Sequence, residues 1–226
     1  MPSYKLCYFD IRGLAECSRF LFAVAKQPYD DCRLSLTFGT PGDFSTIQRP
    51  EFDAAKASGE LDASLGKVPY LEVDGKKIGQ SKAIERYLAR ELGLMGSDSV
   101  EAAQVDQLTE TIRDIKDAYT KAKATSGEEE KKEAIAKFFS EGLVNFVKLA
   151  EKSLPAGPGP WLVGNKVSYA DISWFLFLAS PKGYFDNEEG AKAAYADCPR
   201  VKAAIEATAA IPELVQYIAA RKDTPF

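Results

Sequence analysis

The spacing of apolar residues changes once along this chain, near residues 92–96, and this change constrains the fold more than any other feature. Before it, alternating strand-like runs are interspersed with helical repeats. After it, the apolar repeats fall at the spacings of three and four that are typical of amphipathic helices. A chain of 226 residues is long enough for two modest domains. We therefore predict a mixed α/β domain over residues 1–90 and an all-helical domain over residues 98–226.

The first of these domains is predicted to open with a β-α-β unit. Residues 5–9 form an apolar strand pattern, residues 14–25 form a helical pattern, and residues 33–36 form a second strand pattern. Two consecutive strands joined through a helix pair in parallel, with a right-handed crossover. A hairpin and a helix starting at Ser81 complete the expected domain.

Residues 66–88 combine three local signals that together suggest a ligand site. A proline opens the alternating strand at 70–73, an Asp-Gly turn follows, and Gln80 and Ser81 stand directly before a helical repeat. Pro69 has no amide to donate, and a cis bond before it would leave the Val68 backbone free to pair with an extended peptide. The Ser81 hydroxyl and the free amides of a helix start are suited to a carboxylate. The alternative is an ordinary hairpin followed by an N-capped helix, and this segment alone favours neither.

A polar segment at residues 37–66 separates the two halves of the first domain. Structureless connections of this length are uncommon inside compact domains, so the segment either forms a mobile lid or carries short helices of its own. We predict a flap that faces the ligand.

The helical half shows two strong local patterns. One is a long apolar stripe that must pack against a neighbouring element. The other is a capping box at residues 168–171, in which Ser168 and Asp171 satisfy the first amides of a helix and Val167 and Ile172 flank it as a hydrophobic staple. The run that follows, 172–179, is apolar on nearly all sides, so we expect its helix at the centre of this domain. The stripe consists of Val105, Leu108, Ile112, Ile115 and Tyr119.

Composition excludes several classes of chemistry. The chain has no histidine, which excludes Ser-His-Asp triads, Cys-His nucleophiles and histidine-ligated metals. Its four cysteines show no CxxC pair and no metal-ligand spacing, so we expect buried, reduced thiols and no metal. Any catalysis must then use Tyr, Ser, Lys, Arg, Cys or carboxylate groups.

Charge and hydropathy limit the partners in the same way. A net charge of -4 with interspersed lysines and glutamates offers no basic stripe, so nucleic acid is not an expected partner. No apolar run approaches the roughly 18 residues that cross a bilayer, and the first residues show no signal-peptide pattern. We expect no membrane association and a cytoplasmic location.

Three motifs occur in the order found in the cytosolic glutathione S-transferases. Residues 8–16 (Tyr-Phe-Asp-Ile-Arg-Gly-Leu-Ala-Glu) resemble the family's first strand and helix entry, residues 66–75 and 80–84 resemble its glutathione-binding half, and residues 168–171 resemble its capping box. The likeness covers essentially the full chain. It is most similar to the sigma class, which includes haematopoietic prostaglandin D synthase and the lens S-crystallins, with mu-like and alpha-like features. The resemblance implies an α/β thioredoxin-like N-terminal domain followed by an all-α C-terminal domain.

The resemblance also implies a catalytic role for Tyr8. A thiol has an ordinary pKa of about 8.5, so most of it is protonated at neutral pH. A hydrogen bond from the Tyr8 hydroxyl would favour the glutathione thiolate and lower the pKa of the thiol, with Tyr8 acting as a donor and not as a base. The alternative is a tyrosine that only packs at the end of a strand.

The remaining glutathione contacts follow from matched positions. The segment Lys67-Val68-Pro69 corresponds to the edge that pairs with the cysteinyl backbone, and Gln80 and Ser81 correspond to the site of the γ-glutamyl carboxylate.

Two further contacts carry an alternative each. In the family an acid from the second subunit meets the γ-glutamyl amino group, and this position falls at Asp114; the site would then require a homodimer, whereas the alternative is a solvated carboxylate on a helix face. The glycyl carboxylate is assigned to Lys56, with Arg49 as the alternative.

The electrophile is expected beside the thiolate, bordered by Phe9, Leu14, Tyr119 and the terminal Phe226, whose apolar character suits hydrophobic compounds. Leu14 stands where many sigma and alpha enzymes carry an arginine, so one charge that stabilises the thiolate is missing. Arg12 remains, and we interpret it as a structural ion-pair partner.

The leading hypothesis is a glutathione transferase that conjugates glutathione to hydrophobic electrophiles, with peroxidase or isomerase activity as a side reaction. The alternative is a noncatalytic protein of the same fold, either crystallin-like or a binder of hydrophobic ligands.

Overall fold

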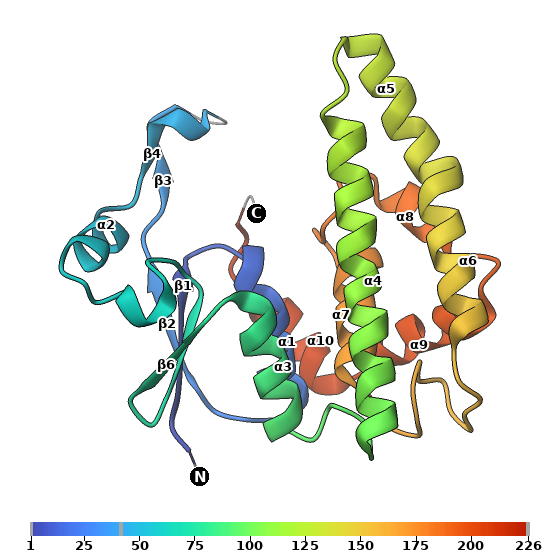
Figure 1. Ribbon diagram of the computed structural model, residues 1–226, viewed down its shortest axis with the longest axis horizontal. Helices are drawn as coiled ribbons and strands as arrows, with labels where there is room; N and C mark the ends of the chain where they lie inside the picture. Colours follow the sequence, from blue (N-terminus) through green and yellow to red (C-terminus); the bar gives the residue numbers. More distant parts are fainter. Residues whose placement is uncertain (1, 41–42, 225–226) are drawn as a thin grey trace. The chain divides into compact units, whose positions relative to one another are not determined.

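The computed structural model describes residues 2–40 and 43–224, which divide into two compact units (Figure 1). The first unit contains Met1–Leu92 together with Gln216–Phe226, and the second contains Gly93–Val215. The expected helical domain ran to residue 226, whereas residues from 216 onward group with the first unit. Contacts made far along the sequence account for this grouping, since the ring of Tyr217 lies 5.5 Å from that of Phe20 and Arg221 pairs with Glu16.

A four-stranded mixed sheet forms the centre of the first unit. Strand β1 (Tyr4–Phe9) pairs in parallel with β2 (Asp30–Leu34) and antiparallel with β5 (Tyr70–Val73), which pairs with β6 (Lys76–Gly79) in the order β2-β1-β5-β6. The prediction of 33–36 for the second strand was wrong at both ends. The register places Cys32 opposite Cys7 and Leu34 opposite Phe9. The other residues of β2 are polar, and they hid this alternation in the sequence.

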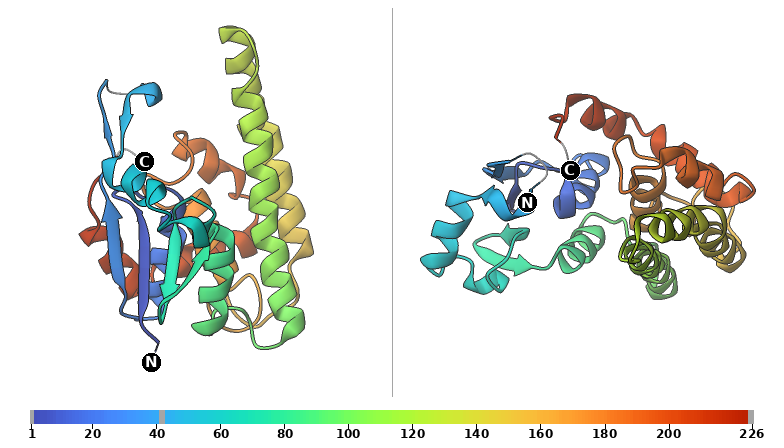
Figure 2. Two further views of the ribbon diagram at one scale, coloured as in Figure 1. Left: turned by 60° about the vertical axis from the view of Figure 1, so that its left-hand side comes forward. Right: turned by 90° about the horizontal axis from the view of Figure 1, so that it is seen from above.

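Helices cover both faces of this sheet (Figures 1 and 2). Helices α1 (Glu16–Val24) and α3 (Ser81–Glu91) pack together on one face. Helix α2 (Pro50–Ala57) covers the other, where Phe52 joins Cys7, Leu61 and Tyr70 in an apolar cluster. Helix α1 is preceded by a short 3-10 turn, η1 (Gly13–Ala15), so the regular helix starts later than the predicted residue 14.

The segment at 37–66 carries short elements of its own, which was one of the two predicted alternatives. They are β3 (Thr37–Phe38), η2 (Phe44–Thr46), β4 (Ile47–Gln48), α2 and η3 (Asp62–Ser64). Strands β3 and β4 pair as a separate hairpin that extends away from the main sheet (Figure 1). A role of this segment as a flap stays a prediction.

The second unit is helical throughout its regular structure, with α7 (Tyr169–Leu178) at its centre. Nearly every residue of α7 is buried, as its uniform apolarity predicted, and Trp174 Nε1 donates to the backbone oxygen of Leu108 over 3.0 Å. All five residues of the predicted stripe are buried on α4. Helix α7 packs against α4 (Ser99–Lys123), α8 (Glu188–Ala194) and α9 (Pro199–Ala209). The unit also contains α5 (Glu128–Lys137), α6 (Leu143–Ser153) and the first part of α10 (Pro212–Ala220).

Two local features shape this unit. The predicted capping box is confirmed: Asp171 Oδ2 accepts from the Ser168 backbone amide at 2.8 Å and from its hydroxyl at 2.7 Å, and Oδ1 accepts from the Leu162 amide at 2.8 Å. Between α5 and α6 a π-helical turn, η4 (Phe138–Gly142), brings two consecutive rings, Phe138 and Phe139, into the interior.

Candidate functional site

Tyr8 lies near the end of β1, just before the chain turns through Gly13 into α1. A Cβ atom placed on Gly13 would be 2.7 Å from Tyr8 Oη, so the phenol closely approaches the backbone of the turn. Gly13 also has a φ of +41°, in the left-handed region that residues with side chains rarely adopt. Glycine is therefore required here by the backbone conformation and by the position of the phenol.

The surroundings of the Tyr8 hydroxyl keep it protonated and oriented. Burial raises the pKa of the phenol above its ordinary value of 10.0, while the Leu14 backbone amide, which donates to Oη, and the charge of Arg19 act in the opposite direction. The phenol therefore keeps its proton at neutral pH. Because the Leu14 amide already occupies the oxygen as a donor, the phenolic proton is left to donate to another acceptor.

The backbone at Val68 is exposed to pairing in the way the sequence suggested. The Val68–Pro69 bond is cis, as predicted. Among the described residues the amide and carbonyl of Val68 make no backbone hydrogen bond, whereas Lys67 is anchored to Ser64 through its amide at 3.3 Å and its carbonyl at 2.8 Å. Pro69 is buried and fixes the start of β5. The chain thus presents one free peptide edge beside a fixed loop.

Gln80 joins β6 to α3 with an unusual backbone conformation, φ +70° and ψ 111°. Its carbonyl accepts the amides of Ala83 at 2.9 Å and Ile84 at 3.0 Å, but its side chain caps no amide. Helix α3 therefore begins at Ser81 without a side-chain cap. The positive end of its dipole can accept an external carboxylate.

The two basic candidates for the glycyl carboxylate differ in their surroundings. Lys56, at the last turn of α2, is exposed, and its Cε lies 3.7 Å from the position of a Cβ on Gly66. Arg49 is engaged elsewhere, because it pairs with Asp53 at 3.2 Å and its guanidinium lies 4.8 Å from the centre of the Phe52 ring. The structure thus favours Lys56, which remains a prediction.

The residues predicted to border the electrophile lie in different environments. Leu14 is 55% exposed, which is unusual for a leucine beside a buried phenol. Phe9 packs on Phe52 with ring centres 5.4 Å apart. Tyr119 is buried on α4 in the second unit, its ring centre 4.9 to 5.7 Å from those of Phe138, Phe139 and Phe185. Phe226 lies outside the described residues, and a joint pocket stays a prediction.

Cys7 precedes Tyr8 but points to the other face of the sheet, because successive side chains of a strand alternate between its faces. Its Sγ lies 2.9 Å from that of Cys32, and burial raises the pKa of the Cys7 thiol to about 12. A thiol so rarely ionised is a poor nucleophile. All four cysteines are free, and only Cys32 is half-buried while the others are buried.

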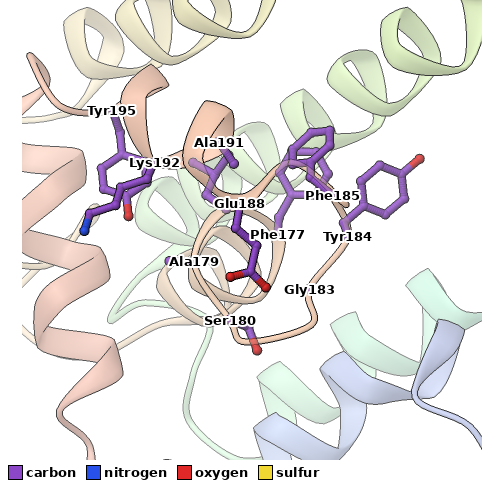
Figure 3. A pocket seen from close by; sticks show the side chains of 11 residues that line it. Phe177, Ala179, Ser180, Gly183, Tyr184, Phe185, Glu188, Ala191, Lys192 and Tyr195 are labelled. Atoms are coloured by element: carbon purple, nitrogen blue, oxygen red, sulfur yellow. The ribbon is translucent and has the colours of Figure 1, made fainter. Parts of the chain in front are cut away.

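The second unit contains a small cavity of its own, of about 100 Å³, between the end of α7 and α8 (Figure 3). Phe177, Tyr184 and Phe185 form its apolar wall, while Glu188 and Lys192 supply charge. Glu188 is already engaged, because it accepts the Lys182 backbone amide at 3.1 Å. Ligand pockets are typically about 300–1,000 Å³. None of the residues predicted for the glutathione site lines this cavity, so it is not the candidate site.

Asp114 lies on an exposed face of α4 in the second unit. One turn before it, Glu110 is paired with Arg113 at 2.8 Å. Its predicted role concerns the site of a second subunit and stays a prediction.

Comparison with known protein families shows whether this chain only resembles a family or belongs to it. The N-terminal domain model of the glutathione S-transferases matches residues 4–90, and their C-terminal domain model matches residues 113–221. The chain belongs to the glutathione S-transferase family. As a glutathione S-transferase it is an enzyme with glutathione as co-substrate, and its two units follow the family's fold.

Individual relatives refine this placement. The hematopoietic prostaglandin D synthase of Gallus gallus is 36% identical over 227 residues, which are 99% of each chain. The probable glutathione S-transferase 5 of Caenorhabditis elegans is 34% identical over 237 residues, with 100% of each chain covered. A crystal structure described as a monomeric glutathione S-transferase of the hookworm Necator americanus superposes with a TM-score of 0.74 at 28% identity, covering 99% of this chain and 100% of that one. These relatives support the sigma-like assignment of this transferase.

Two residues of the transferase that the sequence reasoning missed lie directly behind the Tyr8 turn. Glu16 and Arg19 are both buried at the start of α1, 3.4 Å apart. A signal for them existed, because they are the charged residues on the otherwise apolar face of that helix. Arg12, interpreted from the sequence as an ion-pair partner, donates from Nη1 to Thr224 O at 2.6 Å.

The described part of this transferase contains neither a metal-ligating cluster nor a membrane-spanning helix. Residues 2–40 and 43–224 contain no group of three or more histidine, cysteine or acidic side chains that could hold a metal ion. In the same residues, every helix is too short or too polar to cross a membrane.

Proposed function

We propose that this glutathione S-transferase activates the glutathione thiol through Tyr8. The phenol keeps its proton and donates a hydrogen bond to the sulfur, so the thiol releases its own proton to solvent more readily. The thiolate then forms a C–S bond with an electrophilic carbon of a hydrophobic compound, from which a leaving group departs with its electron pair. The observation that carries this proposal is the close approach of the turn to the phenol, since a Cβ on Gly13 would lie 2.7 Å from Tyr8 Oη. Burial raises the pKa of Tyr8 and outweighs the opposing effects of Leu14 and Arg19, so the phenol keeps its proton at neutral pH.

The proposed position of glutathione uses three features of the first unit. The free backbone edge at Val68 pairs with the cysteinyl residue, the uncapped start of α3 at Gln80 and Ser81 binds the γ-glutamyl carboxylate, and Lys56 binds the glycyl carboxylate. Within residues 2–40 and 43–224, the Val68 backbone makes no backbone hydrogen bond and the start of α3 has no side-chain cap. Together they would hold an extended tripeptide with its sulfur toward Tyr8.

The decisive experiment compares two matched substitutions on one strand. Tyr8→Phe should leave glutathione affinity nearly intact and raise the pKa of the bound thiol toward the ordinary value of about 8.5, as followed by thiolate absorbance against pH. Tyr4→Phe removes the same hydroxyl from the same strand and should leave the titration unchanged. A titration of Tyr8→Phe that overlays the wild-type curve would exclude this role.

We further propose that the enzyme is a cytoplasmic homodimer in which Asp114 of one subunit meets the γ-glutamyl amino group bound by the other. Mass measurement in solution tests the assembly, and the monomeric hookworm relative shows that the outcome is open within this fold. Calorimetric titration with glutathione tests the residue. Asp114→Ala should weaken binding, whereas Asp117→Ala, on the same helix, should not; equal affinities would remove Asp114 from the site.

Two alternatives share this fold. An isomerase reaction, in which the thiolate is regenerated, is suggested by the relative named hematopoietic prostaglandin D synthase. A noncatalytic role is suggested by Leu14, which stands where many sigma relatives carry a charge. Retention on immobilised glutathione together with conjugation of an aromatic electrophile supports the transferase, and retention without turnover of any electrophile in a panel supports the noncatalytic alternative.

A further inference from the structure

Residues 217–224, the last ones that the structure describes, contact the turn that follows Tyr8, and we call this segment the C-terminal clasp. It belongs to the first unit although more than 200 residues separate it from that turn. Figure 1 shows the described segment that follows α10 near the start of α1. The contact begins at the ring of Tyr217, which packs edge-on against Phe20.

Glu16 is the buried acceptor of the clasp. Arg221 Nη1 donates to Glu16 Oε1 at 2.8 Å and Tyr217 Oη donates to Oε2 at 3.2 Å. Glu16 is only 2% exposed, so this carboxylate is held between partners and not by water. Arg19 completes the group from within α1, 3.4 Å from Glu16 Oε2.

The clasp also holds both ends of the turn. At one end Lys222 pairs with Asp10, and Arg33 pairs with the same carboxylate at 3.2 Å. At the other end Arg12 Nη1 donates to the carbonyl of Thr224 at 2.6 Å. The turn is thus tied at Asp10 and Arg12 to residues from the carboxyl end of the chain.

Arg19 connects the buried carboxylate to the same turn. Its side chain is fully buried, and Nη1 donates to the carbonyls of Ile11 at 2.8 Å and Arg12 at 3.4 Å. A carbonyl held by a fixed guanidinium fixes the peptide plane that follows it. The next peptides along the chain carry Gly13 and the Leu14 amide that donates to Tyr8.

We propose that the C-terminal clasp is a positioning element that holds the Gly13 turn, which closely approaches Tyr8 Oη, against the phenol and so tunes the acidity of the bound thiol. This inference rests on the proposed role of Tyr8. Without the clasp the turn can tilt away from Tyr8. The phenol then loses the Leu14 backbone interaction that lowers its pKa, and it becomes a weaker hydrogen-bond donor to the thiol. The clasp residues do not touch the thiol and are not catalytic.

A competing interpretation is that the clasp forms an anion site. A cavity of about 300 Å³ is lined by Asp10, Arg33, Tyr217, Arg221 and Lys222. Each of its three cations already faces a carboxylate, since Arg33 and Lys222 pair with Asp10 and Arg221 pairs with Glu16. Neutralised cations attract an external anion weakly, so the cavity favours water over a ligand.

The test uses the intact enzyme and the substitution Arg221→Met, which keeps the length of the side chain but not its charge. The pKa of bound glutathione, read from thiolate absorbance, should rise by about 0.5–1 unit. Turnover should fall about three- to tenfold near pH 6.5 and match wild type near pH 9, where the thiol ionises without help. The KM for glutathione should stay within about twofold, because no binding contact is removed.

Two further variants separate positioning from stability. Arg221→Lys restores a positive charge and should recover part of the shift. Arg200→Met is the matched control, because Arg200 also ties backbone carbonyls, those of Leu154 at 3.1 Å and Pro155 at 2.7 Å, but in the second unit. It should lower the melting temperature without moving the thiol pKa.

The outcomes distinguish this proposal from the one on which it rests. If Arg221→Met lowers the melting temperature as Arg200→Met does and leaves the thiol pKa unchanged, the clasp is purely structural. If Tyr8→Phe itself leaves the pKa unchanged, the role of Tyr8 fails first. Should Arg221→Met not fold, Lys222→Met replaces it, since that side chain is 66% exposed, and a smaller rise in the same pKa is expected.

Discussion

Side-chain caps begin three α-helices of the second unit but none of α1, α2 and α3 in the first unit of this enzyme. In the second unit α4, α7 and α8 start on side chains that accept backbone amides, namely Asp98, the Ser168 and Asp171 pair, and Asn187. In the first unit α1 and α3 start at Ala15 and Gln80 without any side-chain cap. Capping stabilises a helix start, and leaving it out keeps amides available for other partners. In the short turn η1 directly before α1, the Leu14 amide lies against Tyr8 and lowers the pKa of its phenol.

One helix of the second unit, α9, has no side-chain cap of its own, and a carboxylate from another helix accepts its first amides. At the start of α9 the amides of Arg200 and Val201 donate to the carboxylate of Glu151 on α6, at 3.0 and 2.9 Å. This comparison shows that a helix start without its own side-chain cap can bind a ligand only when no side chain from another helix accepts its free amides.

The largest effect on stability is expected when the buried capping box of α7 is removed. Asp171→Ala removes one acceptor from three donors at a buried site, so we expect the free energy of unfolding to fall by about 3–5 kcal/mol. Asp98→Ala removes an exposed cap from two amides and should cost about 1 kcal/mol. Urea unfolding measures both, and equal losses would contradict a special role of the buried box.

The titration of the same carboxyl group should be visible in stability. Burial raises the pKa of Asp171 from 3.8 to about 6, against the pull of its three donors. The folded protein therefore binds this proton more tightly than the unfolded chain, and the resulting stabilisation is complete below about pH 4 and lost as pH rises through 6. The difference in unfolding free energy between wild type and Asp171→Asn should fall by an amount on the order of 3 kcal/mol across this window. A difference that stays constant with pH would show that Asp171 titrates normally.

Two glycine substitutions in the first unit test whether the position of Tyr8 at the uncapped entry to α1 matters for activity. Gly13→Ala strains a left-handed residue and forces Tyr8 Oη from the Leu14 amide, so we expect kcat/KM to fall about 10- to 100-fold. Gly75→Ala strains a residue with φ +81° where an added Cβ meets nothing within 4 Å. It should affect stability and leave activity within about twofold. A similar loss of activity in both would mean that strain, and not the position of Tyr8, is responsible.

The smallest expected effect concerns Tyr119. Its ring lies inside an aromatic cluster, so Tyr119→Phe keeps the packing and should change kcat/KM for an aromatic electrophile by less than about twofold. Steady-state kinetics at saturating glutathione measure this. A change in KM for the electrophile of tenfold or more would place the Tyr119 hydroxyl at the substrate after all.

Features with a local cause were predictable from the sequence. The switch to helical spacing located the second unit, the capping box at Ser168 and Asp171 is present, and the Val68–Pro69 bond is cis. Each depends on residues within a few positions of one another, so the pattern contains its own explanation. The boundaries of β2 escaped prediction because its alternation is visible only once Cys32 and Leu34 are paired with β1.

The sequence by itself determined the two-part architecture, the exclusion of histidine chemistry and the identity of Tyr8 as the candidate donor. Only the tertiary structure decided what surrounds that donor. Glu16, Arg19 and Arg221 meet behind the Tyr8 turn although Arg221 lies 205 residues from Glu16. No local periodicity encodes such a meeting, because it arises only when burial of one helix face brings distant charges together and leaves them no water to pair with.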